Sequence, residues 1–327
     1  MSGRLLARAA VAVVIFVAGV AGHAQAQTQD RYALIVAGVA GGDKYAENHK
    51  KWTASLESIL AKRLAFAPDH VTILSESGTP TTIATRENVT RVLSSLKERV
   101  KASDTLLIFL MGHGNADSTT AKFNLVGPDM DAKEWKAALE GFAGRLVFVD
   151  TTSSSFPFVQ AMAGKNRVVI AATDSVSQRY DTVFPQYFIE ALEQGTKADA
   201  DKNGRLSVWE AFVYASQAVK AAFDQKGTLV TERSVIDDNG DGVAKEATAT
   251  TGADGVLAKT TFLDPEPAST AANAAVAALE RQRVGLEARI EELKGRKDQM
   301  PAGQYEEEFE KLAVELARIS AQIRAAK

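Results

Sequence analysis

Oxygen-bearing side chains recur at alternate positions in residues 199–210 (DADKNGRLSVWE), which is the spacing of a calcium-binding loop. The segment fits the EF-hand pattern D-x-[DN]-x-[DN]-G-x5-E at every defined position. In such a loop alternating side chains, one backbone carbonyl and a final bidentate glutamate surround the ion. The predicted ligands are Asp199, Asp201, Asn203, Arg205 through its carbonyl, Ser207 and Glu210. The pattern predicts Ca²⁺ as a cofactor, held as a structural clamp; the alternative is an acidic, solvated helix–loop–helix connection.

A second acidic segment, with the sequence DDNGDGV, repeats the front half of this pattern. Asp237, Asn239 and Asp241 take the first, third and fifth positions, and Val243 takes the seventh. Position twelve falls on Thr248, which is not an acid. Two interpretations remain open: a half-loop that binds calcium with ligands from elsewhere, or an Asx-rich turn.

A histidine between two glycines and a run of hydroxyl side chains each follow an apolar stretch. The first group contains His113 and Gly114, and the second, residues 151–155 (TTSSS), contains Ser153. If the two stretches are neighbouring parallel strands ~4.8 Å apart, the histidine and the serines converge over one crevice. The glycines expose backbone N–H groups that suit a developing oxyanion. The alternative is that the glycines form a turn and the hydroxyl run caps the following helix.

Apolar runs alternate with helical patterns along the part of the chain that would position these residues. Short runs rich in Val, Ile and Leu predict buried strands at 31–39, 70–74, 105–111, 146–150 and 168–172. Helical spacing is found at 52–64, 85–100, 134–139, 158–162, 187–192 and 209–223. This alternation predicts right-handed βαβ units and hence a doubly wound α/β domain with a mainly parallel sheet. Ligands of such folds bind beyond the carboxyl ends of the strands.

Six segments, taken in their order along the chain, resemble the caspase/legumain superfamily, most closely its bacterial legumain-like (haemoglobinase-type) peptidases. They are YALIVAGVAGGDKY, TLLIFLMGHG, KFNLVGPD, LVFVDTTSSSFPFVQAM, RVVIAAT and TERSVIDDNGDG, which together span roughly residues 31 to 245. The resemblance implies a caspase/haemoglobinase-like fold, into which residues 199–210 are inserted as an EF-hand-like loop. It also implies a peptide-binding cleft at the carboxyl ends of the strands.

The resemblance also identifies the positions at which the family carries out its chemistry. The histidine that assists the family's cysteine thiolate corresponds to His113, the oxyanion-hole glycine to Gly114, and the cysteine itself to Ser153. The chain contains no cysteine. Thiolate is intrinsically nucleophilic, whereas serine needs a well-placed base. Residues 155–157 (SFP) also replace the family's small glycine-rich step.

These departures imply a peptidase-like fold without peptidase activity, which serves as a binding or scaffolding protein. The alternative is an active hydrolase that uses Ser153 with His113. The expected partner is a protein or peptide, bound in the cleft or by helices at the C-terminal end of the chain.

The composition limits other roles. The formal net charge of −3 gives no basis for a nucleic-acid partner or for attraction to an anionic membrane. The lack of cysteine excludes disulfides, thiolate metal sites and thiol nucleophiles.

Residues 1–26 are typical of a secretory signal peptide. Arg4 and Arg8 precede the apolar run 9–22, and Ala24-Gln25-Ala26 offers small residues at the cleavage site. The apolar run is too short to span ~30 Å of hydrocarbon comfortably, which favours cleavage over an uncleaved anchor. We therefore expect an exported protein, periplasmic or secreted, with no stable membrane span after cleavage.

The end of the chain changes in composition. The α/β domain is expected over residues 27–245, and residues 246–267, rich in Gly, Asp, Thr and Ala, are predicted to be a linker. Residues 268–327 carry apolar side chains at heptad-like steps of four and three, interrupted by Met-Pro-Ala-Gly. They predict an α-helical hairpin of coiled-coil type. It is either self-contained or an oligomerisation device, which makes a homo-oligomer possible.

Overall fold

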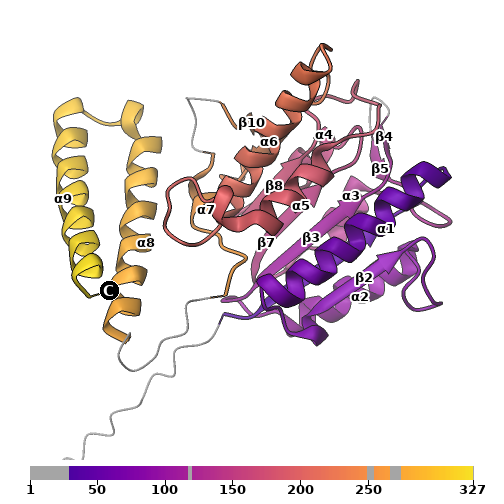
Figure 1. Cartoon of the computed structure of the whole chain (residues 1–327), viewed down its shortest axis with the longest axis horizontal. Coiled ribbons are helices and arrows are strands. Elements are labelled where there is room, and N and C mark those ends of the chain that lie inside the picture. Colours follow the sequence, from indigo (N-terminus) through magenta and orange to yellow (C-terminus); the bar gives the residue numbers. More distant parts are fainter. Residues whose placement is uncertain (1–28, 117–119, 249–253, 266–273, 327) are drawn as a thin grey trace, which may run out of the picture.

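The computed structural model describes residues 29–116, 120–248, 254–265 and 274–326, and Figure 1 shows their arrangement. The predicted signal peptide, residues 1–26, lies outside the described residues. None of the helices in the described ranges combines the length and apolar character that crossing a membrane requires.

A seven-stranded sheet in the order β10-β9-β8-β7-β3-β1-β2 forms the centre of the molecule. Its strands are β1 (Arg31–Ala37), β2 (Val71–Ser75), β3 (Thr105–Met111), β7 (Arg145–Asp150), β8 (Arg167–Ala171), β9 (Val235–Asp237) and β10 (Lys245–Glu246). Strands β2, β1, β3, β7 and β8 pair in parallel, whereas β9 and β10 are antiparallel. The prediction of an α/β fold with a mainly parallel sheet is therefore confirmed.

Helices cover both faces of this sheet, which explains why the strands are nearly continuous apolar runs. One face packs against α1 (Asp43–Ser58), α5 (Phe184–Gln194) and α6 (Val208–Gln225). The other packs against α2 (Arg86–Arg99), α3 (Ala132–Ala138) and α4 (Phe156–Met162). Side chains alternate between the two cores along each strand, so that Ile35 lies in the first and Leu34 in the second.

A second, three-stranded sheet stands at the carboxyl end of β3. It consists of β4 (Gly114–Ala116), β5 (Ala121–Phe123) and β6 (Met130–Asp131), in that order. Because β4 begins directly after His113, this small sheet fixes the backbone on which the histidine and Gly114 lie.

The segment predicted to be a linker packs against the α/β unit over much of its described part. It contains α7 (Val256–Lys259), and both Ala258 and Leu263 are buried in the core beneath α5 and α6. Apolar contacts therefore hold residues 255–264 in place.

Two long helices, α8 (Ala274–Gly295) and α9 (Ala302–Ala326), form the predicted hairpin and lie side by side, with α8 next to α7 (Figure 1). Their shared core consists of Leu286, Ile290, Leu293, Leu312, Ile319 and Ile323. Residues 297–299 form a short 3₁₀ turn between them. The heptad positions thus pack against each other within the hairpin.

Candidate functional site

The predicted calcium loop connects α5 to α6 and brings three carboxylates together. Oxygens of Asp199, Asp201 and Glu210 all lie within 4.8 Å of one another, and no other group of three or more acidic or histidine side chains in the described residues is gathered this closely. Asp199 accepts hydrogen bonds from the backbone N–H groups of Asn203, at 3.1 Å, and Gly204, at 2.9 Å. Gly204 adopts a φ of 86°, which a side chain would strain.

Glu210 is the most enclosed member of this group, with 8% of its surface exposed. Its Oε1 accepts from Ala200 N at 2.9 Å, and its Oε2 accepts from Ser207 N at 2.9 Å and Ser207 Oγ at 2.7 Å. Ser207 in turn caps α6, because its hydroxyl accepts from Glu210 N. The same two residues thus start the helix and close the loop.

The donor set of the loop suits a hard divalent cation. Burial raises the pKa of Asp201, and repulsion from Glu210 raises it further. A cation among these oxygens would relieve both effects and favour the ionised carboxylates. Of the other predicted ligands, Asn203 bonds to Asp201 through its amide nitrogen, and Arg205 donates its backbone N–H to Asn203 Oδ1. The three carboxylates could therefore supply charged oxygen ligands to such a cation.

The second acidic segment repeats part of this hydrogen-bond pattern without gathering its carboxylates. Asp237 accepts from Gly240 N at 2.8 Å and from Gly242 N at 2.7 Å. Asn239 accepts from Asp241 N, and Asp241 accepts from Val243 N. This arrangement is a series of Asx turns, which are known to stabilise loops by themselves.

Two acids that the sequence analysis did not predict as ligands interact here: Asp238, the second residue of this segment, and Asp254, which lies outside it. Asp238 accepts from Gly255 N and Ala258 N, both at 2.7 Å, and so caps the first turn of α7. Asp254 accepts from Asp238 N at 3.0 Å, and burial raises the pKa of Asp254 to about 6. No sequence pattern predicts the contact between Asp238 and Asp254, because these residues are distant along the chain.

His113 lies directly beyond β3, at the carboxyl edge of the sheet, and both of its ring nitrogens face oxygen acceptors. Its Nε2 donates to the carbonyl of Ala40 at 2.6 Å, and its Nδ1 lies 3.0 Å from Asp181 Oδ1. The ring of Tyr45 packs edge-on against it, with the centroids 5.2 Å apart. The hydrogen bond from Tyr45 to Asp181 raises the pKa of the tyrosine.

His49, which the sequence analysis did not predict as a site residue, is buried beside His113. The two ring centroids are 6.3 Å apart. Burial lowers the pKa of His49, and the charge of His113 lowers it further. The sequence analysis also missed Asp181, which lies in the irregular segment after β8, where no periodic pattern marks it.

Ser153 follows β7, the parallel neighbour of β3, and the structure places it against Gly114. Its Oγ donates to the Gly114 carbonyl at 3.1 Å, and 4% of the residue is exposed. A Cβ on Gly114 would lie 2.5 Å from the Ser153 carbonyl oxygen, so only glycine permits this approach. Ser153 and His113 therefore follow neighbouring strands as predicted, but the hydrogen bonds described for them go to other partners.

Segment 174–182 packs against the hydroxyl run, residues 151–155. Ser154, at a φ of 56°, donates its backbone N–H to the Gln178 carbonyl at 2.9 Å. Ser155 occupies the N-cap position of α4, yet its hydroxyl bonds with Thr173 Oγ1 at 3.1 Å and does not cap the helix. The exposed fractions of Ser154 and Ser155 are 3% and 1%.

Asp150, the last residue of β7, directly precedes this run and is fully buried. Its Oδ1 accepts from Thr152 N at 3.0 Å and Thr152 Oγ1 at 2.7 Å, whereas its Oδ2 has no partner among the described residues. Burial raises the pKa of Asp150 to about 6, although the bonds from Thr152 oppose the shift.

Comparison with known proteins adds no family assignment. No protein-family model matches the chain, and no curated protein shows significant sequence similarity to it. The candidate sites therefore rest on the residues and geometry described above.

Proposed function

We propose that this protein is an exported homologue of the caspase/legumain-like peptidases that lacks catalytic activity and acts as a calcium-stabilised binding or scaffolding protein. The observation that carries the proposal is that Ser153 and His113 each form hydrogen bonds with other partners. The serine hydroxyl donates to the Gly114 carbonyl, and the histidine nitrogens face Ala40 O and Asp181.

Serine becomes a useful nucleophile only when a base within hydrogen-bond reach, about 2.6–3.2 Å, accepts its proton. His113 has both nitrogens directed at other oxygens, so it offers no lone pair to Ser153 in this arrangement. The segment 174–182 also leaves little of the hydroxyl run exposed to a substrate. A hydrolytic reaction would require both residues to exchange their present partners.

Calcium has a structural role in this proposal. Asp199, Asp201 and Glu210 would supply the charged ligands, assisted by Asn203, Ser207 and the Arg205 carbonyl. The ion would neutralise carboxylates that lie within 4.8 Å of one another and hold the loop between α5 and α6. The stabilising free energy would come from the ion's preference for the folded loop.

The expected partner is a protein or peptide, and the carboxyl edge of the sheet is one place where it would bind. Tyr180 is 81% exposed there and adjoins Asp181, the partner of His113. Aromatic side chains are enriched among residues that dominate binding energy. The C-terminal hairpin offers the other surface.

One observation favours the alternative, a hydrolase that uses Ser153. The contact between His113 and Asp181 is of the kind that orients a catalytic histidine. The test is to incubate the purified protein with peptide and ester libraries, with Ser153→Ala as control. The proposal expects no turnover by either protein, whereas turnover that disappears in Ser153→Ala would establish the hydrolase.

A further inference from the structure

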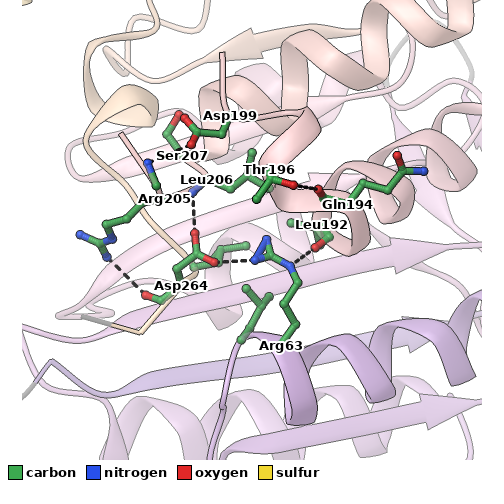
Figure 2. A network of polar contacts seen from close by, with 12 residues as sticks. Arg63, Leu192, Gln194, Thr196, Asp199, Arg205, Leu206, Ser207 and Asp264 are labelled. Carbon is green, nitrogen blue, oxygen red and sulfur yellow. Dashed lines mark hydrogen bonds and ion pairs between the residues drawn. The ribbon is translucent and has the colours of Figure 1, made fainter. Parts of the chain in front are cut away.

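The rear half of the calcium loop is joined to a distant segment of the chain, residues 255–264, which we call the strap. Figure 2 shows the centre of this junction, where Asp264 lies between Arg63 and the backbone of Leu206. The side chain of Asp264 is 12% exposed, and its Oδ1 lies 2.7 Å from Arg63 Nη1. Its Oδ2 accepts from Leu206 N at 2.5 Å.

Arg63 connects the same junction to the helices around the loop. It follows α1 in the chain, and its Nε donates to the carbonyl of Leu192, in α5. Asp264 thus joins the strap, the helical turn 59–63 that follows α1, and loop 199–210 at a single, largely buried carboxylate. A buried carboxylate that loses one of these partners would be left with an unsatisfied oxygen, which is costly.

Every residue from Arg205 to Val208 contacts the strap. Ser207 and Phe262 form an antiparallel bridge, and Val208 N donates to the Thr261 carbonyl at 2.8 Å. The guanidinium of Arg205 lies 4.0 Å from the centre of the Phe262 ring. Two of these residues, Arg205 and Ser207, are also predicted ligands, so one short stretch of backbone would hold the ion on one side and the strap on the other.

The N-terminal part of the strap, which contains α7, lies against the C-terminal hairpin. Asp238 caps α7, and α7 contacts α8. A cavity of about 490 Å³ separates them in part, lined by Leu257 and Thr260 from the strap and by Arg289 and Glu292 from α8. The strap therefore lies between the calcium loop and the hairpin.

We propose that calcium binding at loop 199–210 latches the strap onto the α/β unit and so strengthens the attachment of the C-terminal hairpin. This inference rests on the calcium site of the proposed function. The reason is geometric: an ion that immobilises the Arg205 carbonyl and Ser207 also immobilises the groups that bond to Thr261, Phe262 and Asp264. Thermodynamic linkage requires the effect to be reciprocal, so a loosened strap weakens calcium binding.

The first test is hydrogen exchange by mass spectrometry on the purified protein, treated with EDTA and then given CaCl₂ or, as control, MgCl₂. Peptides from the loop report binding, and peptides from residues 255–264 report the latch. We expect calcium to slow exchange in both, with a change of roughly fivefold or more in the strap. Protection of the loop without protection of the strap would overturn the latch and leave the calcium site standing. Protection of neither would overturn both.

The second test measures calcium affinity by calorimetry in a strap variant. Asp264→Asn removes the charge that pairs with Arg63 but keeps the shape, and we expect its apparent Kd for calcium to rise roughly fivefold or more. Asp224→Asn, at an exposed site in α6, makes the same charge change without touching the strap, and its Kd should change less than about twofold.

A further variant keeps the test decisive if Asp264→Asn folds poorly. Phe262→Leu removes the ring beneath Arg205 and retains an apolar side chain, so it should weaken calcium binding in the same direction. Wild-type affinity in a folded strap variant would overturn the latch, even if the wild-type protein binds calcium tightly.

Discussion

The enclosed carboxyl group of Asp150 makes the stability of this protein depend on pH in a direction opposite to that of a salt-bridged acid. Burial raises its pKa from 3.8 to about 6, so the folded chain keeps a proton that the unfolded chain releases. Stability is therefore highest below pH 3.8 as far as this group is concerned, and it falls as the pH rises toward about 6. A shift of this size corresponds to about 3 kcal/mol of lost stability.

Replacing Asp150 with Asn removes this penalty while keeping an oxygen for the bonds from Thr152 N and Oγ1. The unpartnered Oδ2 becomes an unpartnered amide nitrogen, so the neutral acid and the amide are closely matched. We expect Asp150→Asn to be more stable than wild type by up to about 3 kcal/mol at pH 8, and nearly equal to it at pH 3.5.

The assay is urea unfolding at both pH values, at one fixed calcium concentration, with Asp224→Asn as an exposed control. The control should differ from wild type by less than about 0.5 kcal/mol at either pH. A stability difference for Asp150→Asn that is the same at pH 3.5 and pH 8 would refute the assignment of a buried, protonated carboxyl.

Three other perturbations have expected outcomes. Calcium at about 100 times its Kd should raise the free energy of unfolding by about 2.7 kcal/mol, measured by urea denaturation, and the double variant Asp199→Ala/Glu210→Gln should abolish the gain. Gly114→Ala should destabilise the protein by roughly 1–3 kcal/mol, because its Cβ would lie 2.5 Å from the Ser153 carbonyl oxygen. Gly285→Ala, in α8 with no atom within 4 Å of the added Cβ, should stabilise it by up to about 1 kcal/mol in the same denaturation assay.

The strands of the central sheet were predictable because local composition determines them. Residues 105–111 form β3 with the predicted boundaries, since a strand covered on both faces needs a continuous apolar run. In contrast, α1 was predicted to begin at residue 52 and begins at Asp43. The residues of its first two turns are mainly polar and exposed, so no apolar stripe marks them.

The residues of the candidate sites could be predicted where they are close in sequence, as in loop 199–210, or where they follow neighbouring strands, as do His113 and Ser153. The predicted ligands of loop 199–210 all lie within twelve residues, mostly at alternate positions, and the structure gathers its three carboxylates. Asp181 and the contacts of Asp264 depend on segments that approach each other only in the folded chain. The strap was predicted to be part of a linker because the surrounding residues, 246–267, are rich in Gly, Asp, Thr and Ala, although Ala258 and Leu263 anchor it in the core.

The most direct test of the inactive-homologue account is a covalent trap for a nucleophilic serine. The purified protein would be incubated with a fluorophosphonate probe and an activated acyl ester, and its intact mass then measured. The account predicts an unchanged mass, because the Ser153 hydroxyl bonds to the Gly114 carbonyl and His113 faces other acceptors. An adduct that maps to Ser153 and disappears in Ser153→Ala would contradict it.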